Sequence, residues 1–239
     1  MSPDLIRKAT AELIGTAFLV AAVVGSGIAA SRLSPNDVGL QLLQNSIATG
    51  AVLVALILTL QPVSAAFNPV VSLVEAALGL VPAGAAGVVI VAQVVGGVVG
   101  AVVANLMFDL DPVSWASTQR TGGNLWLAEV VATLGLVLVI FGAIRSGRTS
   151  TVAYAVGGYI TAAYWFTSST SFANPAVTIG RMFSDTFAGI APSSAPGFLL
   201  MQLVGGALAL LLVRFLYPRL ATEAADYLPQ GASDEDRRH

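Results

Sequence analysis

The sequence predicts an all-α membrane protein, in which six transmembrane helices and two re-entrant half-helices form an inverted repeat. Three observations lead to this fold class. The chain is 56% hydrophobic and 10% charged, a composition that lipid solvates and water does not. Six apolar runs are about as long as a helix that crosses the hydrocarbon core. Two Asn-Pro steps, at Asn68 and Asn174, lie in shorter apolar segments.

Composition also limits the function. The net charge of −2 provides no basic surface of the kind that binds nucleic acid, which is therefore excluded as a partner. Cysteine is absent and the single histidine, His239, is the last residue, so we expect no thiolate ligands and no metal site. No pair of acidic residues has a recognisable catalytic spacing, and we therefore expect that the protein is not an enzyme.

The first half of the chain, repeat one at about 9–107, contains three spanning runs. They cover about 9–30, 38–60 and 82–107. The first run has the basic start of a signal peptide, but Glu12 lies inside it and a counterpart occurs later in the chain. Residues 1–8 are expected to form a cytoplasmic N-terminus. The spacing Gly96-x-x-x-Gly100 in the third run is typical of closely packed membrane helices.

A polar stretch at 108–124 separates this half from repeat two, at about 125–217. The second half also has three spanning runs. They cover about 125–144, 151–167 and 196–217. Together the halves form a single domain at 9–217, and the polar remainder, 218–239, is expected to be a flexible cytoplasmic tail.

Each Asn-Pro step marks the start of a short helix. Asn is a strong helix N-cap, and Pro is favoured at the first helical position because its missing N–H needs no partner there. The two segments, at about 63–79 and 168–189, are expected to enter from opposite faces and meet at the midplane, because three spans per half invert the second half. Non-helical backbone at that depth requires a wet cavity or burial in protein. The geometry therefore predicts a pore.

A second pair of motifs supports the inverted repeat. Ala-Glu-Leu-Ile-Gly-Thr at 11–16 is matched by Ala-Glu-Val-Val-Ala-Thr at 128–133. The two glutamates are 117 positions apart and the two asparagines 106. The same order of acid and cap therefore recurs in each half, with small deletions between them.

Lysine and arginine in the short flanks predict the orientation. With both termini inside the cell, eight of the eleven basic residues lie on the inner side. The inner group consists of Arg7, Lys8, Arg145, Arg148, Arg214, Arg219, Arg237 and Arg238. The outer group consists of Arg32, Arg120 and Arg181. We therefore expect a multi-pass protein of the inner or plasma membrane with both termini in the cytoplasm.

These motifs resemble those of the aquaporin and aquaglyceroporin family, the major intrinsic proteins. The resemblance rests on six spans in inverted halves, two Asn-Pro-(Ala/Val) loops and an Ala-Glu-x-x-(Gly/Ala)-Thr start to each half, and it covers about 11–217. It implies a homotetramer with one pore per subunit, passive conduction of water or small uncharged solutes, and no cofactor.

The glutamates inside spanning helices allow two interpretations. Glu12 and Glu129 could form a proton relay of a coupled transporter, or they could accept hydrogen bonds from the re-entrant loops, as the resemblance implies. Thr16 and Thr133 lie one turn further on the same helix faces. A relay needs several titratable groups in series, and the interior has no histidine or lysine, so we favour the loop-supporting role.

The asparagines themselves predict how a pore would select. If Asn68 and Asn174 cap their helices through the side-chain oxygen, each amide NH₂ is left as a donor to a passing hydroxyl oxygen. Aligned peptide dipoles place about half a positive charge at each helix N-terminus. Two such ends facing each other oppose protons and cations, so neutral solutes are expected to pass.

The chain departs from the family's pattern at the positions that control size. Val177 follows the second Asn-Pro-Ala, where the family usually has an arginine, while Val70 replaces the Ala that corresponds to Ala176. An isopropyl group in place of a guanidinium removes up to five donors and a full charge. The outer constriction is therefore expected to be wide and apolar. The other candidate filter residues are Ser171, Thr49 and, by counting back in the fifth run, Ala162.

Arg181 is a candidate for the outer mouth, because it follows Val177 by four residues and shares its helix face one turn further out. An anchor at the membrane interface is an equally good interpretation. A wide filter favours glycerol, urea or neutral metalloid acids, with some water, and atypical bacterial members of the family resemble arsenite channels. A dedicated water channel and a secondary transporter with inverted repeats are the alternatives.

Overall fold

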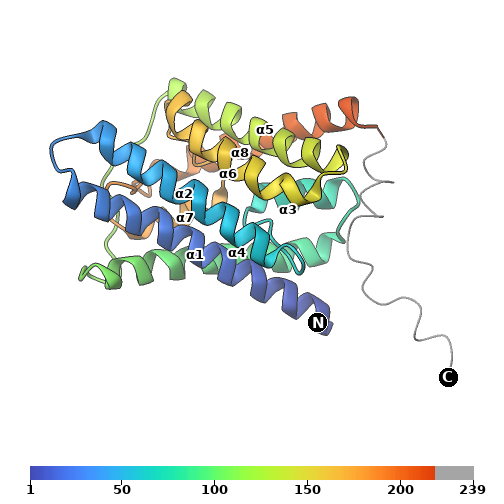
Figure 1. Cartoon of the computed structure of the whole chain (residues 1–239), viewed down its shortest axis with the longest axis horizontal. Coiled ribbons are helices and arrows are strands. Elements are labelled where there is room, and N and C mark those ends of the chain that lie inside the picture. The colour runs from blue at the N-terminus through green and yellow to red at the C-terminus, as the bar shows by residue number, and fades with distance from the viewer. Residues whose placement is uncertain (219–239) are drawn as a thin grey trace.

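The computed structural model describes residues 1–218 as a bundle of helices that run side by side along one axis (Figure 1). Five helices are long and apolar enough to cross a membrane. They are α1 (Pro3–Leu33), α2 (Val38–Leu60), α4 (Ala83–Met107), α5 (Gly123–Arg145) and α8 (Ala195–Leu216). The predicted fifth span is α6 (Val152–Phe166), which has 15 residues and is about 22 Å long at 1.5 Å per residue. The 3₁₀ turn η1 (Thr149–Thr151) precedes it.

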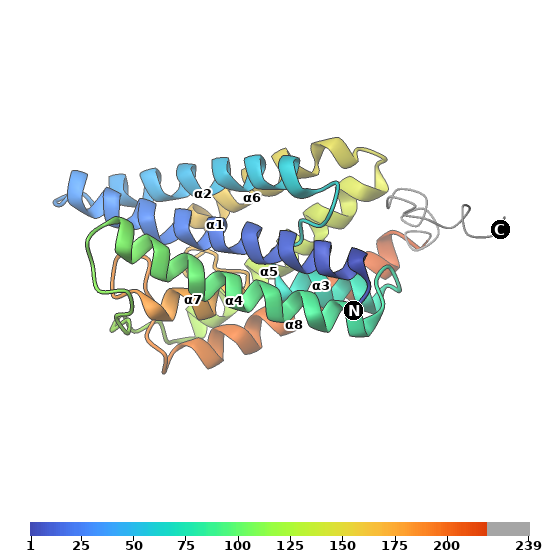
Figure 2. The same cartoon turned by 90° about the horizontal axis from the view of Figure 1, so that it is seen from below.

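Two short helices occupy the middle of the bundle. They are α3 (Pro69–Ala77) and α7 (Pro175–Gly180), and α7 continues into the 3₁₀ turn η2 (Arg181–Phe183). In Figures 1 and 2, α7 and α3 follow one another along the long axis of the molecule. Each begins at the proline that the sequence predicts as its first residue, and each is too short to span a membrane.

The first helix is longer than its apolar run. It begins at Pro3, because the Ser2 hydroxyl caps it by accepting a hydrogen bond of 3.3 Å from the Leu5 N–H. Residues 3–8, which include the charged Asp4, Arg7 and Lys8, are thus helical and extend the bundle at the end where the N-terminus lies. Of the predicted tail, 218–239, all residues after Pro218 lie outside the described part of the chain.

Close approaches of helix backbones hold each half together. A Cβ on Gly96 would lie 2.3 Å from the Leu13 carbonyl oxygen, and one on Gly100 would lie 2.2 Å from that of Ala17. Helices α4 and α1 therefore touch along the predicted small-residue spacing. In the second half, Gly205 of α8 has the same relation to α5, with the Val130 carbonyl oxygen at 2.6 Å.

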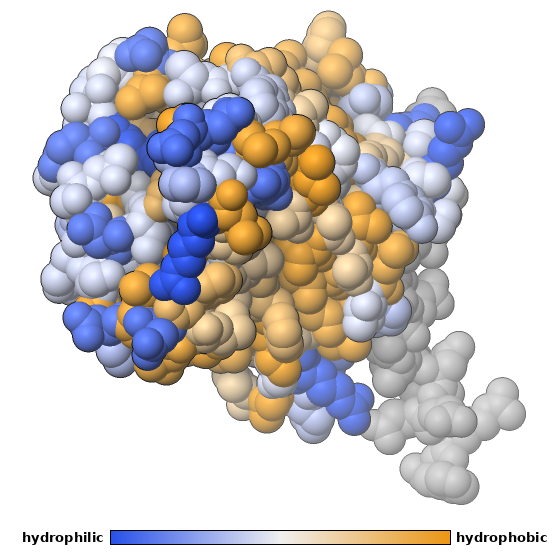
Figure 3. Space-filling model, turned by 60° about the vertical axis from the view of Figure 1, so that its left-hand side comes forward, coloured by the Kyte–Doolittle hydropathy of each residue, from blue (hydrophilic) through white to orange (hydrophobic). Residues whose placement is uncertain are grey.

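The outer surface of the bundle is apolar over its middle. Large hydrophobic side chains are exposed on most of the long helices, for example Phe18 of α1, Val91 of α4 and Leu211 of α8. Figure 3 shows apolar surface in the middle of one face of the molecule and hydrophilic surface gathered at its left-hand end. Such a surface suits a lipid environment. The first residue and the last turn of α8 lie at the same end of the bundle (Figures 1 and 2).

Candidate functional site

The N-termini of α3 and α7 meet, and an asparagine caps each of them. The Oδ1 of Asn68 accepts a hydrogen bond of 3.0 Å from the Val70 N–H. The Oδ1 of Asn174 accepts from the N–H groups of Ala176 and Val177, at 2.9 and 3.2 Å. These bonds satisfy amide groups that have no partner inside the helix.

The two caps are also joined to each other's loops. Nδ2 of Asn68 donates to the Ala173 carbonyl and Nδ2 of Asn174 donates to the Phe67 carbonyl, both at 2.7 Å. An amide NH₂ has two donor hydrogens. One N–H of each asparagine therefore links the loops, and the second is left for a solute. Sequence reasoning assigned the whole NH₂ group to the solute and missed this link.

The residue before each asparagine has an unusual backbone conformation. Phe67 and Ala173 both have φ of 49°, in the left-handed region that costs an L-residue about 1–2 kcal/mol. The same residues supply the carbonyl oxygens that accept from the opposite asparagine. Backbone strain at these two positions thus accompanies the cross-link, as is common where a site is held in one geometry.

Two buried carboxylates hold the loops. Glu12 accepts from the N–H groups of Ala66 and Phe67, at 2.8 and 2.7 Å. Glu129 accepts from those of Phe172 and Ala173, at 3.0 and 2.9 Å. Charge-assisted hydrogen bonds of this kind are about twice as strong as neutral ones. This geometry agrees with the loop-supporting interpretation, and neither Glu12 nor Glu129 lines either of the two cavities described below.

Each carboxylate has a glutamine partner that sequence reasoning missed. Gln93 of α4 donates to Glu12 at 2.8 Å and to Ser72 at 3.0 Å. In the second half, Gln202 of α8 makes the equivalent pair of bonds, donating to Glu129 at 2.6 Å and to Thr178 at 2.9 Å. The sequence contains a signal for these two glutamines, because each is a polar amide within an apolar run. Their separation of 109 positions also lies between the 106 of the two asparagines and the 117 of the two glutamates.

The threonines one turn after the glutamates do not join these networks. The hydroxyl oxygens of Thr16 and Thr133 are buried and have no hydrogen-bond partner in the structure. Both side chains are fully buried in the bundle. Their contribution to the loops is therefore packing and not a hydrogen bond.

A cavity of about 50 Å³ begins at the two asparagines and extends along α7. Its apolar lining consists of Leu19, Val23, Leu53, Leu136, Val156, Ile160, Phe172 and Val177. Its polar lining consists of Thr49, Asn68, Tyr164, Ser171, Asn174 and Arg181. The hydroxyl oxygen of Ser171 is buried and has no partner among the described residues, so it is available to a solute. The lining therefore offers hydrogen bonds and apolar contacts to the same molecule.

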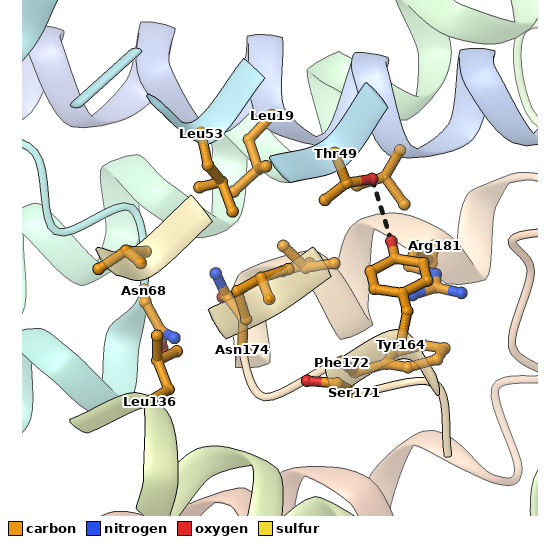
Figure 4. A pocket seen from close by; sticks show the side chains of 14 residues that line it. Leu19, Thr49, Leu53, Asn68, Leu136, Tyr164, Ser171, Phe172, Asn174 and Arg181 are labelled. Carbon is orange, nitrogen blue, oxygen red and sulfur yellow. Dashed lines mark hydrogen bonds between the residues drawn. The ribbon is translucent and has the colours of Figure 1, made fainter. Parts of the chain in front are cut away.

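The far end of this cavity is built differently from the prediction. Tyr164 of α6 lines it, and its hydroxyl lies 3.1 Å from that of Thr49 in α2. Figure 4 shows this bond, with the Tyr164 ring beside Phe172 and Arg181 behind it. The predicted residue of α6, Ala162, is instead exposed and does not line the cavity. The structure therefore brings the large side chain of Tyr164 to the cavity in place of the predicted Ala162.

The residues that follow the two Asn-Pro steps divide between the cavity and the core. Val177 lines the cavity, whereas Val70 packs in a core cluster with residues of α5 and α8, and Ala176 is buried away from the lining. Arg181 also lines the cavity and is 2% exposed. This burial does not fit an anchor at the membrane interface.

A larger cavity of about 550 Å³ lies on the other side of the asparagines, toward the end of the bundle that holds the N-terminus and the last turn of α8. Ser64 and Ala66 of the first loop line it near the asparagines, and Lys8 lines it near the N-terminus. Val156 borders both cavities. Within residues 1–218, no cluster of three or more histidine, cysteine, aspartate or glutamate side chains could hold a metal ion.

Comparison with known proteins agrees with this architecture. The family model described as "Major intrinsic protein" matches residues 1–152. Aquaglyceroporin AqpS of Rhizobium meliloti (strain 1021) is 51% identical over 214 residues, which are 89% of this chain and 91% of that protein. The X-ray structure of the aquaglyceroporin from Plasmodium falciparum has a TM-score of 0.69 at 17% identity, covering 91% of this chain and 99% of that one. The predicted fold class is confirmed.

Proposed function

Since the chain belongs to the major intrinsic protein family, we propose that it is a passive transmembrane channel for small uncharged solutes. The preferred solutes are glycerol, urea and neutral metalloid acids of the arsenite type, and some water passes with them. The relative that shares 51% identity is named an aquaglyceroporin, which supports a solute of the glycerol class.

One observation carries the proposal. Asn68 and Asn174, cross-linked through each other's loops, lie where the 50 Å³ cavity begins, and the larger cavity lies beyond them. A row of sites for a solute thus continues on both sides of the asparagines. Each amide keeps one N–H that a solute oxygen can accept.

The chemistry of the lining supports a polyol or a metalloid acid. Leu53, Ile160 and Val177 present hydrocarbon, while Thr49 and Ser171 present hydroxyl groups. A solute with a carbon skeleton and several hydroxyl groups can satisfy both kinds of surface at once. A cation is excluded in this proposal, because the N-termini of α3 and α7 both place positive charge at the asparagines.

Val177 is the proposed size determinant nearest the asparagines. A valine there leaves more room and fewer donors than an arginine would. In this proposal, Thr49, Ser171, Val177 and the two asparagines line the pore, and Glu12 and Glu129 support its loops. We also propose that the protein forms homotetramers and that both termini lie in the cytoplasm.

The test is stopped-flow uptake of water, glycerol and arsenite into proteoliposomes, comparing the wild type with Val177→Arg. The variant should lower the uptake of glycerol and arsenite by about tenfold or more, and that of water less, because a guanidinium both narrows the cavity and adds donors. Val177→Met is the matched control, since it adds length without charge. Unchanged glycerol and arsenite uptake by Val177→Arg would show that position 177 does not control size.

The alternatives give different results in the same experiment. A dedicated water channel admits water but neither glycerol nor arsenite. A secondary transporter accumulates solute only with a proton or sodium gradient, so its uptake stops when an ionophore removes the gradient. A passive channel equilibrates the solute at the same rate with or without the ionophore.

A further inference from the structure

Arg181 is a buried cation at the outer end of the 50 Å³ cavity, and the proposed function assigns it no role. Its side chain is 2% exposed and lines the cavity. Within residues 1–218, the only ion pair joins Lys8 and Asp4, so no carboxylate in that range pairs with Arg181. Its positive charge therefore acts on whatever occupies the cavity.

Contacts on one side fix the position of this guanidinium. Its carbon Cζ lies 3.4 Å from the centre of the Phe172 ring, and its Nε donates a hydrogen bond to the Ala188 carbonyl oxygen. Cation–π contact and the hydrogen bond engage one face and one N–H of the group. The terminal nitrogens remain as donors for a solute in the cavity.

A second arginine contacts the same ring and the same loop. The Cζ of Arg120 lies 5.2 Å from the centre of the Phe172 ring, and its Nε donates to the Gly189 carbonyl at 2.9 Å. The carbonyls of two successive residues thus each accept from a different arginine. Arg120 does not line the cavity, so it acts on Arg181 through Phe172 and the loop at 187–189.

The groups at this level of the cavity come from three elements. Tyr164 of α6 and Thr49 of α2 are joined by their hydroxyls, and Arg181 follows α7. Figure 4 shows Arg181 next to the Tyr164 ring. A solute that reaches the asparagines from this end passes the guanidinium first.

We infer that Arg181 determines the charge selectivity of this pore one turn outward of Val177, and that Arg120 and Phe172 are positioning residues that hold it there. The inference rests on the proposed function, because it assigns part of the selectivity of the same channel. Size is then controlled near Val177, and Arg181 adds to the barrier that the helix N-termini at the asparagines oppose to cations, whereas a single arginine after the Asn-Pro-Ala would combine control of size and charge.

Urea and guanidinium provide a direct test, because they have nearly the same shape and differ by one positive charge. Uptake of each is measured in proteoliposomes that contain the wild type, Arg181→Gln or Arg181→Lys. Arg181→Gln keeps a donor for the Ala188 carbonyl but loses the charge, so the ratio of guanidinium to urea uptake should rise about tenfold. Arg181→Lys keeps the charge, and its ratio should stay within about twofold of the wild type.

Arg32→Gln is the matched control. Arg32 also lies over a phenylalanine, with its Cζ 5.3 Å from the centre of the Phe108 ring, and donates to a backbone carbonyl at 2.7 Å, but it does not line the cavity. The ratio of guanidinium to urea uptake in Arg32→Gln should equal that of the wild type. Arg120→Gln should raise the ratio by a smaller factor, about threefold, because Arg181 keeps its charge but loses part of its support.

The outcomes separate this inference from the proposed function. An unchanged ratio in Arg181→Gln, with normal urea uptake, overturns the inference and leaves the channel function intact. A wild type that admits neither urea nor glycerol overturns the proposed function, while guanidinium entry through Arg181→Gln alone still supports the inference. If Arg181→Gln does not assemble, as judged by size-exclusion chromatography, an unchanged ratio in Arg120→Gln overturns it.

Discussion

At the scale of single residues, Tyr164 changes the picture of the narrow part of the pore. It is 3% exposed, lines the cavity and is joined to Thr49 by its hydroxyl. Ala162, two positions earlier, is exposed on the other side of the helix. A helix turns 100° per residue, so a two-residue difference in counting places a side chain almost opposite to its expected direction.

A pair of variants tests whether Tyr164, and not Ala162, lines the cavity. Tyr164→Ala removes a ring from the cavity, and it should raise the uptake of a larger polyol such as ribitol relative to glycerol by about tenfold. Ala162→Phe adds a ring to the exposed side of α6 and should leave both rates unchanged. Stopped-flow uptake into proteoliposomes measures both. If Ala162→Phe loses glycerol uptake and Tyr164→Ala has no effect, residue 162 and not residue 164 lines the filter.

At the scale of elements, the short helices depend on both halves of the chain. Each loop carries an asparagine that bonds the other loop's backbone, and each is held by a carboxylate from the first helix of its own half. The glutamines of α4 and α8 then join each carboxylate to its short helix. The junction is therefore a property of four long helices and not of the Asn-Pro motifs alone.

The close contact of α1 and α4 gives a prediction on stability. Gly100→Ala places a methyl group 2.2 Å from the backbone carbonyl of Ala17, which must separate the helices at a cost of about 1–3 kcal/mol. Gly87→Ala, in the same helix, meets nothing within 4 Å and should be neutral or stabilising by up to about 1 kcal/mol. Unfolding in detergent, followed by circular dichroism, measures the difference. Equal stability of the two variants would contradict the close packing.

At the scale of the whole molecule, the bundle has its N-terminus and the end of α8 on one side. The loop between α5 and α6 lies at this end as well, because α5 runs toward it. The loop between α4 and α5 lies at the opposite end. The fold thus determines which loops share a side, whereas the distribution of lysine and arginine predicts which side is the cytoplasm.

A chain without cysteine allows this arrangement to be measured by labelling. Single cysteines at Ser2→Cys and Ser146→Cys should react with an impermeant maleimide only after cells are permeabilised, and Thr118→Cys should react in intact cells. All three side chains are exposed. Opposite behaviour of Ser2→Cys and Ser146→Cys contradicts the fold. The reverse pattern at all three positions contradicts only the predicted orientation.

The bounds of the elements were largely predictable. The second run, 38–60, coincides with α2, and the predicted starts of α3 and α7 at the two prolines are those of the structure. Apolar length and capping residues are local properties, so a single chain displays them directly. The early start of α1 at Pro3 was missed because hydropathy marks the lipid-buried part of a helix and not its polar extension.

By itself, the sequence determined that the chain is a membrane protein with an inverted repeat and two capped helices that face each other. Those features follow from hydropathy, from the odd number of spans per half and from the chemistry of Asn-Pro. Only the tertiary structure decided which side chains line the cavity. Tyr164 lines it, Ala162 and Val70 do not, and Arg181 reaches it with support from Phe172. The reason is that lining depends on the rotation and contact of helices distant in sequence, which periodicity in an almost uniformly apolar run does not record.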